Sequence, residues 1–277
     1  MNRSGHNPAR RNRNIGTAKS GSGRDNRLVI PWAWTDNRVY YNRLVDPVRV
    51  EINVRSFPVP VIVEPPLNGF FHACTLDDLA RILNLLPFEH IRDIQAFVFR
   101  QPKRKERILA PAWGRLVYWT DICGHSGPVV YLESQEPGKA WKWKKSLAPD
   151  DADELDRLRL DGHRIETDQR HHTIHFTQES VRNTQLYRTL PHEIGHYADY
   201  LTKVENPCGQ DHSDWSERND RYHARPSMEK EAFAHRYADA FRERNRSQGH
   251  LPFERLFDPA NLKRMGLKPI WFDPEAI

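Results

Sequence analysis

The pentapeptide H-E-I-G-H at residues 192–196 places two histidines four residues apart, with a glutamate directly after the first. Residues four apart lie on one face of a helix, so the imidazoles of His192 and His196 can bind a single metal ion. The carboxylate of Glu193 can then take a proton from a water molecule held at that ion. The spacing therefore predicts hydrolytic chemistry with two zinc ligands and a general base.

A catalytic zinc site as a rule has three protein ligands, so a third ligand must lie elsewhere in the chain. Glu231 is the first candidate, because enough chain separates it from His196 for a loop and a returning helix. Glu229 is the next candidate, although a glutamate in the first turn of a helix is also favoured by the helix dipole. His212 and His235 remain open as alternatives.

The segments HEIGHYAD and EAFAHRY, beginning at His192 and Glu231, resemble the glutamate zincins. The similarity is greatest to the catalytic domain of anthrax lethal factor and related toxin peptidases. That group has His-Glu-x-Gly-His-x-x-Asp, then Glu-x-Phe-Ala-x-x-aromatic on a later helix. The ImmA/IrrE-type peptidases share the layout, with a Glu-Ala pair that is Glu231-Ala232 here. The resemblance implies that His192, His196 and Glu231 bind Zn²⁺ and that Glu193 is the base of a metallopeptidase.

The same resemblance implies a catalytic tyrosine, for which Tyr222 is the counterpart. It lies two residues farther from Glu231 than the pattern of the lethal-factor group has it. Asp199 could accept a hydrogen bond from the ring N–H of a ligand histidine. Gly195 costs about 1 kcal/mol of helix propensity relative to alanine, which indicates close packing or a need for room near the site. Cys123 could place a thiol near the metal, but a buried or idle cysteine is the simpler interpretation.

Two other functions fit the same motif. In a DNA-associated protease of the SprT kind, the third ligand is a histidine in a His-Gly-x-x-aromatic stretch. His212-Ser-Asp-Trp215 resembles this pattern but is one residue shorter and lacks the glycine. In a non-catalytic binding module, the metal would only brace the fold. A site closed by four protein ligands would favour that alternative.

The elements that hold these residues follow from the spacing of apolar side chains. Thr75 and Asp78 predict the start of a helix that Pro87 ends, and Thr189 is expected to cap the motif helix with Pro191 in its first turn. Helices are predicted over 76–86, 149–160, 179–187 and 228–244, the last with a buried stripe of Phe233, Tyr237 and Phe241. Strands are predicted over 48–54, 59–63, 96–100, 107–109, 115–119, 128–133 and 172–176.

This order predicts an α+β, zincin-like fold, in which a twisted sheet packs over the active-site helix and a second ligand-bearing helix. The expected organisation is a disordered basic arm (1–27), an irregular β-rich lead-in (28–70) and a metallopeptidase domain (71–277). A sheet edge near the motif helix could hold an extended protein or peptide substrate by strand addition. The stretches 128–133 and 172–176 are the best guesses for that edge.

The composition sets the remaining limits. The 277 residues carry a net charge of +5 and contain three widely spaced cysteines, which indicate neither a disulfide framework nor a cysteine zinc cluster. The N-terminus lacks the apolar segment of a signal peptide, and no apolar run is long enough to span a membrane, so a cytoplasmic protein is expected. Export by another route stays open. The basic arm, a basic run at 100–107 expected to form a hairpin loop, and the loop WKWKK (141–145) could bind nucleic acid, although solvated segments explain them as well.

Overall fold

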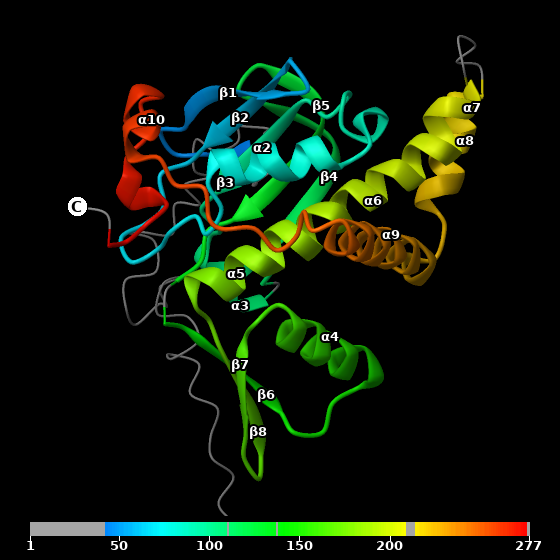
Figure 1. Cartoon of the computed structure of the whole chain (residues 1–277). Helices are drawn as coiled ribbons and strands as arrows, with labels where there is room; N and C mark the ends of the chain where they lie inside the picture. Colours follow the sequence, from blue (N-terminus) through cyan, green and yellow to red (C-terminus); the bar gives the residue numbers. More distant parts are fainter. Residues whose placement is uncertain (1–41, 110, 137, 209–213, 276–277) are drawn as a thin grey trace, which may run out of the picture. The chain divides into compact units, whose positions relative to one another are not determined.

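The computed structural model describes residues 42–109, 111–136, 138–208 and 214–275 (Figure 1). They belong to one compact unit, Asn42–Ile277, which combines helices with two β-sheets and is therefore of the expected α+β class. The predicted basic arm 1–27 and residues 28–41 of the predicted lead-in lie outside the described residues.

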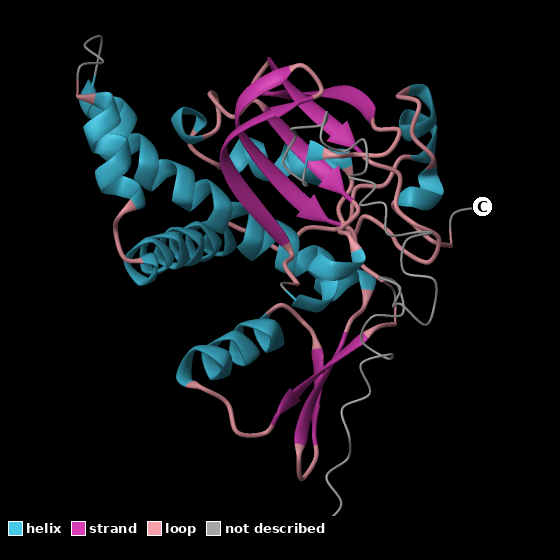
Figure 2. Ribbon diagram, turned by 180° about the vertical axis from the view of Figure 1, so that it is seen from behind, coloured by secondary structure: helices cyan, strands magenta, loops and turns pink. Residues whose placement is uncertain are grey.

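The main sheet has five strands, which are β1 Val48–Val54, β2 Phe57–Val63, β3 Ala96–Arg100, β4 Gly114–Ile122 and β5 His125–Glu133. Their order is β1-β2-β3-β5-β4, so β1 and β4 form the two edges. The β2–β3 and β3–β5 pairs are parallel, while both edge strands pair antiparallel (Figure 2). The strands β1 and β2 from the predicted lead-in thus belong to the same sheet as the later strands. The central strand β3 is buried along its whole length, which explains its continuous apolar sequence.

Helices cover one face of this sheet (Figure 1). The helix α2 (Leu76–Leu85) begins at the predicted capping box, in which the Thr75 side chain accepts from the Asp78 N–H and Asp78 accepts from the Thr75 N–H. Beside it runs a continuous helical rod, and the long helix α9 packs against the rod. The rod consists of α5 Gln178–Thr184, η4 Gln185–Thr189, α6 Leu190–Tyr200 and η5 Leu201–Glu205, and α9 spans Ser227–Ser247. The apolar faces of the sheet, α2 and the rod share one core.

A second, smaller sheet has the order β6-β8-β7, with β6 Ala140–Lys144, β7 Arg164–Thr167 and β8 His171–His175. The helix α4 (Pro149–Leu160) contributes to its separate core, which includes Trp113 and Ile174. The stretch 141–145, expected to be a loop, mostly forms β6. Trp141 and Trp143 lie two residues apart on the face that packs on this core. These aromatic rings therefore do not form an exposed stacking surface for nucleic-acid bases.

Three further predictions are wrong. The basic run 100–107 is not a hairpin loop and residues 107–109 are not a strand, because β3 pairs with β5 and the chain instead enters the helix α3 (Arg104–Leu109). Glu106 stabilises the start of this helix, since its Oε2 accepts from the Lys103 N–H at 2.8 Å and from the Arg100 guanidinium at 2.6 Å. The stretches 128–133 and 172–176 are not sheet edges either. The first lies in β5, between β3 and β4, and the second is mostly β8, between β6 and β7.

Shorter elements complete the described residues. The 3₁₀ turn η3 (Phe88–His90) follows α2, and a C-terminal segment returns to the main core through Leu251, Leu262, Leu267 and Phe272. The other elements are α7 Asn206–Cys208, α8 Trp215–His223, α10 Pro259–Arg264 and η6 Pro269–Trp271. Among the described residues, no helix is long and apolar enough to cross a membrane.

Candidate metal centre

The motif residues lie in the second half of the helical rod. Thr189 does not cap a new helix there, because its backbone is helical (φ −62°, ψ −52°) and its side chain makes no capping bond. Instead, the rod widens into a π-helical turn, in which the Leu190 N–H donates to the carbonyl of Gln185. Pro191 lacks an N–H and its ring clashes with the carbonyl four residues earlier in a regular helix. The wider turn accommodates this proline, so α5 and α6 form one straight support for the motif.

Three potential ligand atoms converge on one point between α6 and α9. The Nε2 atoms of His192 and His196 lie 3.1 Å apart. The Oε2 atom of Glu231 lies 3.2 Å from the first, and its Oε1 atom lies 3.6 Å from the second. Tetrahedral zinc with bonds of about 2.0–2.1 Å requires its ligand atoms to lie about 3.3 Å apart. Two imidazoles and a carboxylate at these distances fit a zinc ion both in geometry and in chemistry.

The electrostatics of these three groups are coupled. Hydrogen bonds to His192 and His196 hold the pKa of Glu231 well below its ordinary value, against the opposing effect of burial. Burial disfavours the charged form of His196, but the hydrogen bond to Glu231 and the nearby charge of Glu193 raise its pKa overall. The carboxylate therefore stays ionised at neutral pH, as a metal ligand must.

The other candidates for the third ligand are placed differently. Glu229 points away from the histidines, with its Oε2 3.4 Å from Nε of Arg225. His235 lies one turn after Glu231, and its ring centroid is 4.5 Å from that of His192. His192, Glu231 and His235 also form a group that could hold a metal ion, since each offers one ligand atom and these atoms lie within 4.8 Å of one another. His212 lies outside the described residues.

Gly195 permits the close crossing of the two ligand-bearing helices. A Cβ atom built on it would lie 3.0 Å from Cβ of Tyr237 and 3.2 Å from Cα of Ala234. The buried face of α9 is accordingly Ala234, Ala238, Phe241 and Asn245. The predicted stripe is correct only at Phe241, since Phe233 and Tyr237 are half-buried. Small residues at the crossing bring the backbones close enough for Glu231 to reach the histidines of α6.

The edge strand β4 lies beside α6 and orients the predicted base. One carboxylate oxygen of Glu193 accepts a hydrogen bond of 2.7 Å from the backbone N–H of Leu116. Gly114, two residues earlier, has no room for a side chain, because a Cβ atom there would lie 2.6 Å from the carbonyl oxygen of Tyr131 and 3.0 Å from Thr189. The strand and the two helices enclose a cleft of about 400 Å³, lined by Leu116, Tyr118, His192, Glu193, His196, Ser227, Lys230 and Glu231.

Tyr222, the tyrosine predicted to assist catalysis, is buried and does not line this cleft. Its hydroxyl donates to the carbonyl of His196 at 3.3 Å and lies 3.0 Å from the hydroxyl of Tyr118. Tyr118, on β4, is the tyrosine that lines the cleft. Neither it nor Leu116 was predicted to belong to the site. Nothing in the local sequence around them indicates this, since only the packing of β4 on α6 brings them to the motif.

Asp199 does not orient a ligand histidine as expected. Its buried carboxylate bonds to the Lys203 ammonium and to the Arg225 guanidinium, the latter at 2.7 Å. Burial alone would raise the pKa of Asp199, but these two hydrogen bonds lower it overall. Arg225 precedes the start of α9, so this ion pair ties the ligand-bearing helix α6 to the beginning of α9. Cys123 lies in the turn between β4 and β5 and is not among the residues that line the cleft.

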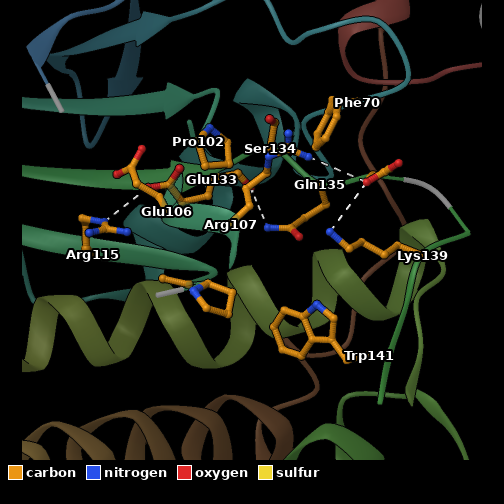
Figure 3. Close-up of a pocket in the computed structure, with 13 residues that line it drawn as sticks. Phe70, Pro102, Glu106, Arg107, Arg115, Glu133, Ser134, Gln135, Lys139 and Trp141 are labelled. Atoms are coloured by element: carbon orange, nitrogen blue, oxygen red, sulfur yellow. Dashed lines mark hydrogen bonds and ion pairs between the residues drawn. The ribbon is translucent and has the colours of Figure 1, made fainter. Parts of the chain in front are cut away.

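A second, small pocket lies at the start of β4 (Figure 3). Glu133, which is 1% exposed, accepts from Arg100 at 2.9 Å there, and its carboxylate lies 3.3 Å from Arg115. Burial raises the pKa of Glu133, although both guanidinium charges oppose that effect. The free volume of about 30 Å³ suits a water molecule rather than a substrate. This ion-pair cluster joins β3, β4 and β5 and so holds the edge strand in place.

Comparison with known proteins yields no relative. No family model matches the chain, and no curated protein and no solved structure gives a significant match.

Proposed function

We propose that this chain is a zinc-dependent endopeptidase of the glutamate-zincin type, with His192, His196 and Glu231 as the ligands. The convergence of the two imidazoles and the Glu231 carboxylate, with distances of 3.1–3.6 Å between their nitrogen and oxygen atoms, carries the proposal, together with the nearby Glu193 carboxylate. These groups face a cleft with room for a substrate. A metal that only braces a binding module is normally enclosed by four protein ligands, which is a poorer match to such an open position.

A zinc ion in this site would act as a Lewis acid and lower the pKa of a water molecule toward about 7. Glu193 accepts the proton of the attacking water and passes it to the leaving nitrogen. The Leu116 N–H holds one oxygen of that carboxylate, which lines the cleft, and leaves the other oxygen for the proton transfer. The base thus needs little reorientation before the reaction, which keeps the cost of proton transfer low.

The edge of β4 supports a protein or peptide as the substrate. Within a strand, the N–H and C=O of one residue point to the same side, and alternate residues repeat that direction. The Leu116 N–H points away from β5 toward Glu193, so the carbonyls of Leu116 and Gly114 also point away from β5. An extended peptide pairing with this edge would pass directly over the ligand histidines. We therefore assign substrate binding to the edge of β4 and not to the stretches 128–133 and 172–176, which the sequence had suggested.

Metal analysis of purified variants tests the ligand set. We expect one zinc per chain in the wild type, and loss of zinc in Glu231→Gln but not in Glu229→Gln, a matched change on the same helix. Zinc retained in Glu231→Gln but lost in His235→Ala would refute the ligand set. Loss in His212→Ala, together with salt-sensitive DNA binding, would instead favour the SprT-like alternative.

Cleavage assays test the reaction. Glu193→Gln should keep its zinc and lose roughly 10²–10⁴-fold in the rate of peptide hydrolysis, which is the usual contribution of a general base. A quenched-fluorescent peptide library supplies the substrates. A zinc-loaded wild type that cleaves none of them would favour the non-catalytic binding module, and a fully active Glu193→Gln would exclude Glu193 as the base.

A further inference from the structure

The edge strand β4 contains a bulge at the cleft. Val117 pairs with Val129, but the next pair joins Thr120 to Gly127, so β4 has one residue more than β5 in this interval. The residue of β5 skipped there is Pro128, which has no N–H to donate to the ladder. Bulges commonly redirect side chains next to active sites. Here the bulge comprises Tyr118 and Trp119 and begins two residues after Leu116, whose N–H holds the Glu193 carboxylate.

Tyr118 keeps the same face of the strand as Leu116, two residues before it, and lines the cleft with the predicted ligands. Its ring is held by three others, with centroid distances of 5.0 Å to Tyr200, 5.3 Å to His223 and 5.9 Å to Tyr222. Such a cage fixes the position of its hydroxyl group. Burial and the hydrogen bond with Tyr222 raise the pKa of Tyr118, so the hydroxyl stays protonated at neutral pH.

The two tyrosine hydroxyls form a short chain. Tyr222 donates its hydroxyl proton to the His196 carbonyl in a hydrogen bond of 3.3 Å. Tyr118 is therefore the donor in the 3.0 Å hydrogen bond between the two hydroxyls. The first of these bonds is long and therefore weak. Both hydroxyl groups can therefore rotate at little cost in free energy. After this rotation, Tyr222 donates to Tyr118 and Tyr118 donates into the cleft.

We propose that Tyr118 is a catalytic residue, whose hydroxyl donates to the negative charge that develops on the substrate's carbonyl oxygen, and that Tyr222 is a positioning residue behind it. This inference rests on the proposed peptidase function. It moves the oxyanion donor from α8, where the sequence predicts it, to the edge strand. Because the aromatic cage holds the Tyr118 oxygen in place, only the hydroxyl protons have to turn for Tyr118 to donate to the developing charge.

Three Tyr→Phe variants in the zinc-loaded protein test this inference. Removing one oxyanion donor lowers kcat by roughly 10²–10³-fold, so we expect a loss on that order in Tyr118→Phe with KM changed less than about twofold. Tyr222→Phe should lose about tenfold, because Tyr118 keeps its own proton. Tyr187→Phe is the control, since the buried Tyr187 donates to the carbonyl of Phe253 at 3.3 Å and does not line the cleft, and it should retain its activity.

Inhibitor binding gives a readout independent of turnover. A phosphinic pseudopeptide, built on the best substrate of the peptide library, carries a tetrahedral anion where the oxyanion forms. Its dissociation constant, measured by calorimetry, should rise in Tyr118→Phe by a factor close to the loss in kcat/KM. A larger kcat loss in Tyr222→Phe than in Tyr118→Phe, or unchanged inhibitor affinity in Tyr118→Phe, would overturn the assignment. Failure of the peptidase proposal itself is distinguishable, because the wild type would then bind no zinc or cleave no peptide.

Discussion

Replacing Gly195 by alanine tests whether the crossing of α6 and α9 sets the geometry of the metal centre. The new Cβ would lie 3.0 Å from Cβ of Tyr237 and 3.2 Å from Cα of Ala234. Carbon atoms prefer a separation of about 3.5–4.0 Å, so the helices must separate by roughly half an ångström. The contacted atoms belong to the backbone or are attached directly to it, so no rotamer change relieves the clash. Glu231, one turn before Ala234, must move with α9.

The effects on folding and on zinc binding differ in size. Alanine gains about 1 kcal/mol of helix propensity over glycine, while overpacking costs about 1–3 kcal/mol, so the net loss of stability is about 0–2 kcal/mol. Metal–ligand distances tolerate only about 0.2 Å. A shift of Glu231 by roughly half an ångström should therefore raise the dissociation constant for zinc at least about tenfold, which corresponds to about 1.4 kcal/mol.

Competition with a chromophoric chelator measures the zinc affinity, and urea unfolding measures the stability with and without zinc. Ala240→Gly, at an exposed position of α9, is the control. It should lose about 1 kcal/mol of stability and keep its zinc affinity, because it changes helix propensity without touching α6. If Gly195→Ala gains stability by about its helix propensity and binds zinc as tightly as the wild type, the reasoning on the close crossing is refuted.

Two further predictions concern buried polar groups of the core. Burial lowers the pKa of His72 from 6.5 to about 4, so the unfolded chain takes up a proton before the folded one, and stability should fall by about 3 kcal/mol as the pH drops from 6.5 to 4. Urea unfolding at the two pH values should show a smaller loss of stability in His72→Gln than in the wild type, and the exposed change His250→Gln is the control. An equal loss in the wild type and both variants would contradict the role of His72. Asp78, fully buried, holds the Arg182 guanidinium through two bonds of 2.8 Å, so Asp78→Asn should cost about 3–5 kcal/mol. The exposed change Asp93→Asn should cost less than about 1 kcal/mol, and similar values for both would show that the buried pair contributes no more than a surface pair.

The helices were more predictable from the sequence than the strands. The capping box of Thr75 and Asp78 is a local signal, and it marks the start of α2 correctly. The helix α6 begins at Leu190 with Pro191 in its first turn, as predicted, but Thr189 does not cap it, because a π turn continues the helix in front of it. The residues 107–109 were predicted as a strand from three side chains, too few to distinguish a strand from the last turn of a short helix.

Several properties of the candidate site follow from the sequence alone. His192, Glu193 and His196 are brought together by the helical repeat, which requires no knowledge of the rest of the chain. Glu231 could be named as the first candidate because its segment matches a pattern already associated with the motif. The sequence also indicated close packing at Gly195. A glycine inside a helix lowers the stability of the helix, and a close contact that only glycine permits can offset this loss.

Only the tertiary structure decided how the site is completed. The placement of Glu231, Glu229 and His235 relative to the two histidines depends on how α9 crosses α6, which the sequence of either helix does not specify. Leu116 and Tyr118 reach the motif because β4 pairs with β5 at the edge of the sheet and the sheet packs on α6. Strand order depends on contacts between distant segments, whereas helical periodicity is local. The pentapeptide therefore brings together the two proposed histidine ligands and the proposed base, and the packing of β4 and α9 on its helix brings Glu231 beside them and forms the walls of the cleft.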